Sequence, residues 1–286
     1  PGGGSNSSAA AKLSYDVPHR IPWDWRVSLY TWTKAIAAGV YLVVILAALL
    51  GVVSWESQVV EWVAPAVGLF FLAVTGVVLI FDLEHPERFY YLFVRPQWRS
   101  WLVKGAVIIL VYGAALSVHL LASILGSVGL AQAAAVVGVP AGVMTAVYTA
   151  YLFAQSKARD LWQSPLLPFH MAWQAAMAGT AVVSLAAPAW APEAADTLGV
   201  WLAVGAGLHL LLVWGEVTLA HPTAHARLAV RELTRGRYRA WLWGSVALVA
   251  VGLLGPVAAW AGVPLLAGLA VYEHGYVQAA QSVPLA

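Results

Sequence analysis

The sequence contains no cysteine and few charged residues. Cysteine is absent from all 286 residues, and Asp, Glu, Lys and Arg together make up only 10% of them. Without thiolates this chain forms no disulfide and offers no cysteine ligand to a metal or an iron–sulfur cluster. Any iron–sulfur cluster that serves this chain must therefore belong to a partner subunit. The formal net charge of +2 adds little about partners, and we expect none of them to be a nucleic acid.

Apolar residues dominate what is present. Hydrophobic residues make up 61% of the chain, and 15 residues are Trp. Because a soluble domain of this length has far fewer apolar residues, the composition indicates a protein that crosses a membrane several times. Eight apolar segments each approach the ~20 residues that a helix needs to cross the hydrocarbon layer. They are residues 28–53, 62–82, 101–125, 130–155, 166–188, 198–220, 241–260 and 263–280.

We therefore predict an all-α membrane protein with eight transmembrane helices. The apolar segments lie in a domain of residues 27–286. Residues 1–26 are predicted to form an extramembrane tail, because their Gly-, Ser- and Asn-rich start is too polar to pack a core. Membrane lipid is the first partner that this architecture implies.

Positive charge falls on one side of the predicted topology. All fifteen Lys and Arg residues lie at the start of the chain or in and beside the connectors that follow the second, fourth and sixth segments. The charged residues of the opposite connectors are all acidic. Loops rich in Lys and Arg remain in the cytoplasm, so both termini are predicted to be cytoplasmic. We expect a multi-pass protein of a prokaryotic inner membrane.

Ionisable residues inside the apolar segments are the best indication of function. An unpaired charge in hydrocarbon costs about 3 kcal/mol or more, so such residues are candidates for a functional site. Most of them fall within a few helical turns of the basic side, whereas His209 lies near mid-depth and His119 towards the other side. The set comprises Lys34, Asp82, His119, Tyr148, Tyr151, His170, His209, Glu216, Glu273 and His274.

Each of these residues also has a purely structural interpretation. Lys34 and Glu273 could extend their side chains to the membrane surface. Tyr148 and Tyr151 suit an aromatic belt, and buried histidines often only complete a hydrogen bond. The clustering of these groups beside a basic connector that contains Trp162 favours a site for an amphipathic head group that exchanges protons.

Several short motifs resemble one family. Asp82-Leu-Glu-His-Pro-Glu-Arg-Phe89 closes the second segment, and Arg95-Pro-Gln-Trp-Arg-Ser100 follows it. Tyr148-Thr-Ala, Lys157-Ala-Arg-Asp-Leu-Trp-Gln-Ser-Pro-Leu-Leu-Pro168, Glu273 and Ala279-Ala-Gln-Ser-Val-Pro-Leu285 come later. In this order they resemble the NrfD/PsrC-like integral membrane subunits of respiratory oxidoreductases, typified by polysulfide reductase.

The resemblance implies a particular assembly. Such subunits form two four-helix bundles and hold no haem or iron–sulfur cluster of their own. They bind a quinone or quinol, menaquinone or ubiquinone, near the face where an iron–sulfur subunit docks. That subunit connects the quinone site to a molybdopterin-type catalytic subunit, where the substrate chemistry takes place.

The resemblance, together with the residue types, also implies roles for individual residues. Tyr148 would donate a hydrogen bond to a quinone carbonyl, in a site that includes Tyr30, Lys34, Tyr151 and His170. The proton relay would consist of Asp82, His119, His209, Glu216 and Glu273. Five basic residues would face the iron–sulfur partner or orient the connectors: Arg88, Arg95, Arg99, Lys157 and Arg159.

The chain departs from the family pattern at several positions. Tyr30 and Lys34 occupy the region of the first segment where polysulfide reductase has His and Asn at its quinone site. Ala150 and Ala280 stand where the family often has Gly, and Trp98 stands where Phe is usual.

Two other classes of membrane protein remain as alternatives. A haem-b anchor needs axial histidines at matching depth, for which His170 and His274 are the candidates. A secondary transporter would also have polar residues at mid-depth, although the sequence shows neither paired broken helices nor a clear inverted repeat. Proton translocation through His209 and His119 is a further hypothesis.

Overall fold

The computed structural model describes residues 23–283, and this part of the chain is helical without a strand. Most of the predicted tail, residues 1–26, therefore lies outside the described residues. The α-helices are α1 (Trp25–Leu49), α2 (Ala64–Asp82), α3 (Tyr91–Val94), α4 (Trp101–Ile124), α5 (Val128–Ala154), α6 (Leu167–Trp190), α7 (Ala195–Thr218), α8 (Ala224–Thr234), α9 (Arg239–Ala250) and α10 (Gly262–Gln281).

Seven of the eight predicted segments each correspond to one long helix, whereas residues 241–260 fall on the 12-residue α9 followed by two short 3-10 turns. Five helical spans among residues 23–283 are long and apolar enough to cross a membrane. They are Trp25–Leu49, Val59–Asp82, Trp101–Ile124, Val128–Ala154 and Pro192–Thr218. Polar side chains interrupt α6 and α10, and the apolar helix Arg239–Leu254 is shorter than the other five. The structure therefore confirms an all-helical protein with several membrane spans, whereas eight crossings remain a prediction.

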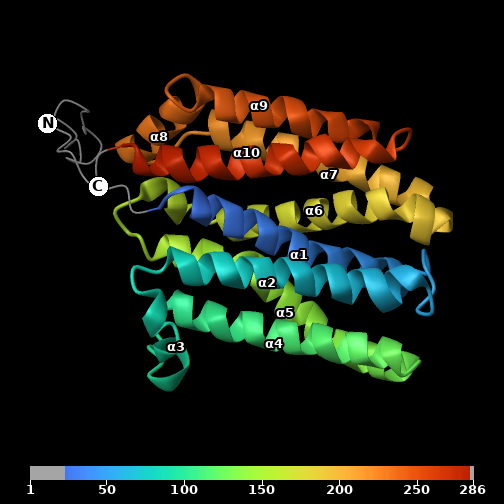
Figure 1. Cartoon of the computed structure of the whole chain (residues 1–286). Coiled ribbons are helices and arrows are strands. Elements are labelled where there is room, and N and C mark those ends of the chain that lie inside the picture. The colour runs from blue at the N-terminus through green and yellow to red at the C-terminus, as the bar shows by residue number, and fades with distance from the viewer. Residues whose placement is uncertain (1–22, 284–286) are drawn as a thin grey trace, which may run out of the picture.

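Helix α1 occupies the centre of the molecule. The long helices lie side by side in an elongated bundle, in which α1 contacts α2, α5, α6 and α10 (Figure 1). Helices α2, α4 and α5 pack on one side of it, and α6, α7, α9 and α10 on the other. The short helices α3 and α8 lie at the same end of the bundle as the start of α1 (Figure 1). We call this the connector end.

Two glycines bring the backbones of α1 and α6 into direct contact. A Cβ atom on Gly39 would overlap the carbonyl oxygen of Ala175, and a Cβ atom on Gly179 would overlap the backbone of Gly39. Small residues at such positions let membrane helices approach closely, since lipid supplies no hydrophobic force between helices. The helix pair therefore depends on close backbone packing at this crossing.

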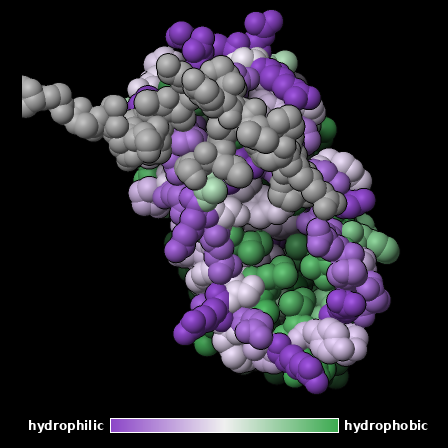
Figure 2. Space-filling model, turned by 90° about the vertical axis from the view of Figure 1, so that its left-hand side faces the viewer, coloured by the Kyte–Doolittle hydropathy of each residue, from purple (hydrophilic) through white to green (hydrophobic). Residues whose placement is uncertain are grey.

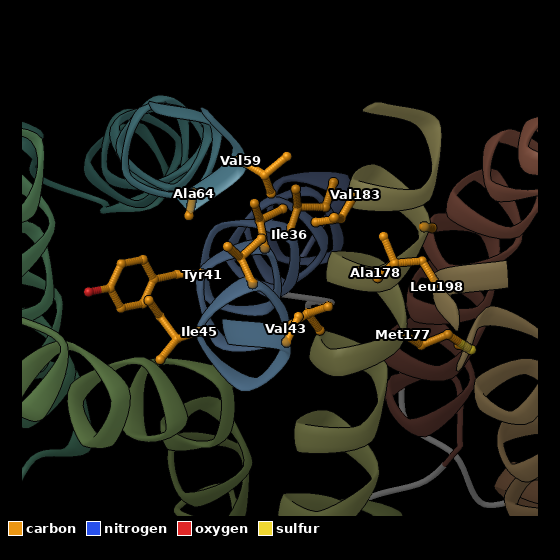
Figure 3. Close-up of a cluster of buried hydrophobic side chains, with 14 of the residues drawn as sticks. Ile36, Tyr41, Val43, Ile45, Val59, Ala64, Met177, Ala178, Val183 and Leu198 are labelled. Atoms are coloured by element: carbon orange, nitrogen blue, oxygen red, sulfur yellow. The ribbon is translucent and has the colours of Figure 1, made fainter. Parts of the chain in front are cut away.

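The core continues outward from this contact. Buried aliphatic side chains of α1 and α6 pack around it, and Tyr41 points from α1 towards α4 and α5 (Figure 3). The Tyr41 ring meets the Tyr112 ring edge-on, with centroids 6.1 Å apart. The Tyr112 hydroxyl donates to the carbonyl oxygen of Ala37 at 2.8 Å, so α4 is tied to the backbone of α1.

The two ends of the described chain meet the central connector at the connector end. Trp23 stacks on Trp162 with ring centroids 4.4 Å apart. The Gln281 side chain pairs with the Trp23 backbone, donating to its oxygen at 2.8 Å and accepting from its nitrogen at 3.1 Å. Arg159 donates to the carbonyl oxygens of Gln281 at 3.2 Å and Val283 at 3.0 Å. We call these residues the terminal clamp.

We predict that Gly39→Ala and Gly179→Ala each destabilise the protein by about 1–3 kcal/mol, because the added methyl group meets backbone that cannot move aside. Gly244→Ala is the matched control, since a Cβ atom there has no neighbour within 4 Å. The measurement is the temperature at which the detergent-solubilised protein loses its folded state. Equal stability of Gly179→Ala and Gly244→Ala would contradict the close contact.

Candidate functional site

Lys34 is buried in the interior of α1 and is held by three groups of α5. The whole residue is only 1% exposed to solvent. The Nζ atom donates to Thr149 Oγ1 at 2.6 Å and to the carbonyl oxygen of Ala146 at 3.0 Å. It also lies 4.6 Å from the centre of the Tyr148 ring. The structure therefore excludes the alternative in which Lys34 extends to the membrane surface.

Tyr148 lies beside Lys34 and lines an apolar cavity. Its ring packs against Gly105 so closely that a Cβ atom there would overlap it, so glycine makes room for the tyrosine. Tyr30, which is also buried, lies close to Tyr148 and Thr149. Three of the five predicted quinone-binding residues therefore lie together: Tyr30, Lys34 and Tyr148.

The cavity beside Tyr148 is formed by α2, α4 and the connector that contains α3. Its volume is about 160 Å³, and its lining is almost entirely apolar: Gly76, Leu79, Ile80, Leu83, Phe89, Leu92, Phe93, Leu102, Ala106, Ile109, Leu110 and Tyr148. Figure 2, which views the connector end, shows a hydrophobic hollow in the lower half of the molecule, where Figure 1 has α2, α3 and α4. We call this cavity the Tyr148 slot.

A second polar cluster lies on the other side of α1, between α6, α7 and α10. His170 Nε2 and His209 Nδ1 are 3.2 Å apart and share a hydrogen bond. His170 Nδ1 lies 3.6 Å from Glu216 Oε2, which accepts a hydrogen bond from the Tyr272 hydroxyl at 2.6 Å. The rings of His170, His209 and Tyr272 are also in mutual contact. We call these four residues the His170 cluster.

Glu273 lies between the two sets of residues. The residue is buried, and its carboxylate interacts electrostatically with Lys34 and Glu216 and lies near the Gln174 side chain. It follows Tyr272 on α10, and Gln174 lies one turn beyond His170 on α6. A series of buried polar groups therefore runs from Lys34 through Glu273 to the His170 cluster.

The other predicted relay residues are placed apart from this series. Asp82, at the end of α2, is partly exposed and has electrostatic neighbours in Asp24, Arg26 and Tyr30. His119 is buried in α4, where its Nδ1 atom lies 2.9 Å from the Tyr41 hydroxyl. The structure thus gives His119 a local hydrogen-bond partner.

Tyr151 and His170 are not brought to the Tyr148 slot. Tyr151 is 37% exposed and stacks on Trp101, with ring centroids 4.5 Å apart. His170 belongs to the separate cluster described above. The predicted quinone-binding set is therefore divided between two locations and the surface.

The five predicted docking residues divide in the same way. Arg88, Arg95, Arg99 and Lys157 are exposed at the connector end. Arg159 is buried in the terminal clamp, where it orients the connector rather than facing outward.

Sequence reasoning missed Thr149, Gln174 and Tyr272. Each has a neighbour that was predicted: Thr149 follows Tyr148, Tyr272 precedes Glu273, and Gln174 lies four residues after His170 on the same helix face. Their polarity inside apolar helices was the available signal. A neutral polar side chain costs less free energy inside a membrane than a charged one. It is therefore a weaker indication of a functional site.

A model of the family described as polysulphide reductase, NrfD, matches residues 14–267. The chain belongs to the NrfD family. It is therefore a multi-pass membrane subunit of a respiratory oxidoreductase, as the sequence motifs indicated. NrfD subunits generally assemble with an iron–sulfur subunit and a catalytic subunit. A search of curated proteins found no match to the chain.

The NrfD assignment supports neither alternative class. The two candidate haem ligands each have another neighbour: His170 Nε2 lies 3.2 Å from His209 Nδ1, and His274 Nδ1 lies 3.5 Å from the Ser28 hydroxyl. No group of three or more His, Asp or Glu residues suited to a metal ion occurs within residues 23–283.

We predict that Lys34 and Glu273 are energetically coupled. Lys34→Met and Glu273→Gln should each destabilise the protein, because each leaves one buried charge without its counterpart. The double variant should be more stable than the sum of the two losses predicts, by about 1 kcal/mol or more. The thermal unfolding of the four proteins in one detergent gives this coupling, and additive losses would contradict it.

Proposed function

We propose that this NrfD subunit exchanges electrons between a membrane quinone in the Tyr148 slot and a docked iron–sulfur subunit. The observation that supports this most directly is the buried pair of donors, Tyr148 and Lys34, beside an apolar cavity. A quinone carbonyl accepts hydrogen bonds but cannot donate one. A phenol hydroxyl and an ammonium group are therefore suitable partners for it.

The apolar lining of the slot suits the rest of a quinone. The ring and its isoprenoid chain are hydrophobic, and the lining residues from α2, α3 and α4 provide an apolar surface for them. Lys34 donates to Thr149 and Ala146, and an ammonium group has three N–H donors, so one further hydrogen bond remains possible. The proposal covers menaquinone and ubiquinone equally.

Reduction of a quinone to a quinol consumes two electrons and two protons. The iron–sulfur subunit supplies the electrons, and the proposed proton donors are Lys34 and the buried groups that follow it. We assign Glu273, Glu216 and His209 to a proton relay that includes His170 and Tyr272, and the contacts among the last four groups support this assignment. Asp82 is placed to serve Tyr30 from the connector end.

The exposed basic residues at the connector end support a docking role. Arg88, Arg95, Arg99 and Lys157 give this surface positive charge, which favours an acidic partner face. We propose that the iron–sulfur subunit docks here, on the cytoplasmic side, and connects the slot to a molybdopterin-type catalytic subunit.

Tyr148→Phe tests the hydrogen-bond donor. The variant keeps the ring but loses the hydroxyl, so quinone-linked turnover of the complex should fall about tenfold. Turnover with a soluble artificial dye should be unchanged, because the dye takes electrons from the other subunits. An unchanged quinone rate would remove Tyr148 from the proposed site.

Gly76→Phe tests the location of the slot without altering a polar group. Gly76 lines the slot, and a Cβ atom there has no neighbour within 4 Å, so the ring should enter the cavity. We expect quinone-linked turnover to be lost while dye turnover persists. Gly244→Phe, an equal enlargement at a position without close neighbours, should leave both rates unchanged. Normal quinone turnover in Gly76→Phe would place the quinone elsewhere.

Proton translocation to the far side is a separate part of the proposal. His119 lies apart from the relay and bonds Tyr41, so we expect His119→Phe to leave the ratio of protons moved to electrons transferred unchanged. His209→Phe should lower that ratio, because His209 ends the buried series. Both ratios are measured with the complex in sealed vesicles, and equal values for wild type and His209→Phe would exclude translocation through His209.

A further inference from the structure

A cleft separate from the Tyr148 slot leads to the His170 cluster. Its volume is about 310 Å³, and it lies between the starts of α6 and α8 and the end of α7. Its walls are the connector residues 160–161, 163–166 and 219–223, together with Leu212 and Gly215 of α7. His170 and Glu216 also line it. None of these residues lines the slot, so we treat the two as distinct and call this one the His170 cleft.

The principal buried acceptor of hydrogen bonds and protons in this cleft is the carboxylate of Glu216. Glu216 offers a carboxylate, which accepts about four hydrogen bonds in all. Tyr272 donates one of these at 2.6 Å. His170, only 5% exposed, lies 3.6 Å from the same carboxylate and shares its other nitrogen with His209. A ligand that donates hydroxyl hydrogens therefore matches the cleft.

The rim of the cleft is apolar where it faces outward. Leu166 is 54% exposed and Leu219 is 62% exposed, and both line the cleft. Large exposed side chains on the same face of α7, Leu211 and Trp214, continue this surface. Such a rim suits an amphipathic molecule that arrives from the lipid rather than a soluble ion.

The charges of the lining exclude an anionic head group. Asp160 and Glu216 contribute carboxylates, whereas no Lys or Arg is among the residues that line the cleft. A phosphate placed between two carboxylates would be repelled, and no Lys or Arg of the lining would offset this repulsion. An uncharged head group with hydroxyl donors meets neither problem.

We propose that the His170 cleft is a second head-group site, which binds the reduced quinol in preference to the quinone. The Tyr148 slot presents a donor, the Tyr148 hydroxyl, with Lys34 behind the same ring, and the cleft presents an acceptor, the Glu216 carboxylate. A quinol carries two hydroxyl donors, and a quinone carries none. The proposal depends only on the chemistry of the cleft, so it remains testable if the slot binds no quinone.

The test is an equilibrium titration of the full-length protein, with the subunits that co-purify, in a neutral detergent. The probe is heptyl-hydroxyquinoline N-oxide, a quinol analogue whose fluorescence is quenched on binding. We expect two sites in wild type and one in Gly215→Phe, whose ring fills the cleft because a Cβ atom there meets only Leu219, at 3.8 Å. Gly244→Phe should retain both sites.

The polar floor and the preference for the reduced form are tested in the Gly76→Phe background, where the slot is closed. Glu216→Gln should weaken the remaining probe site about tenfold or more, because a neutral amide replaces the charged acceptor. His170→Phe should weaken it as well, because the imidazole beside that carboxylate is lost. Reduced menadione should displace the probe at concentrations at least about tenfold lower than oxidised menadione.

Three results would overturn the proposal. One is an unchanged number of probe sites in Gly215→Phe, and another is equal displacement by the two forms of menadione. The third is displacement by phosphatidylethanolamine but not by reduced menadione, which would identify a phospholipid site. If Gly76→Phe retains two probe sites while Gly215→Phe loses one, the slot assignment fails and the cleft assignment stands.

Discussion

The contact between the backbones of Gly39 and Gly179 fixes the geometry on which the polar interior depends. Lys34 lies five residues before Gly39 on α1, and Gln174 lies five residues before Gly179 on α6. The two helices run in the same direction, so both side chains sit about 7.5 Å from the crossing, towards the connector end. Glu273 of α10 interacts electrostatically with Lys34 and lies near Gln174. A shift of one helix against the other would separate these three groups.

The interior combines two kinds of polar environment on opposite sides of α1. Around Lys34 the partners are a threonine hydroxyl, a backbone carbonyl and an aromatic face, which stabilise a cation without a carboxylate in contact. Around Glu216 the partners are a phenol and an imidazole. One side thus offers donors and the other acceptors. A molecule that alternates between an acceptor form and a donor form can be distinguished by two such sites.

Sequence reasoning predicted the helices and most of the polar residues, but not how these residues would be grouped. Tyr148 and Tyr151 lie three residues apart on α5, yet one is buried and the other is exposed beside Trp101. Because nearly every residue in a membrane helix is apolar, the pattern does not reveal which face packs inward. Long-range pairs such as His170 with His209, or Arg159 with Gln281, depend on tertiary packing between segments that no local pattern relates.

The terminal clamp and the Lys34–Glu273 interaction also constrain the order in which the protein can be completed. Lys34 enters the membrane with the first helix, and Glu273 is synthesised 239 residues later. At typical rates of translation this interval is about 10 s or more. During this time the ammonium group lies in the membrane without its carboxylate, and Trp23 lacks the Gln281 side chain that later joins it. Until then the partners available to the ammonium group are the Ala146, Tyr148 and Thr149 groups of α5, which is synthesised well before α10.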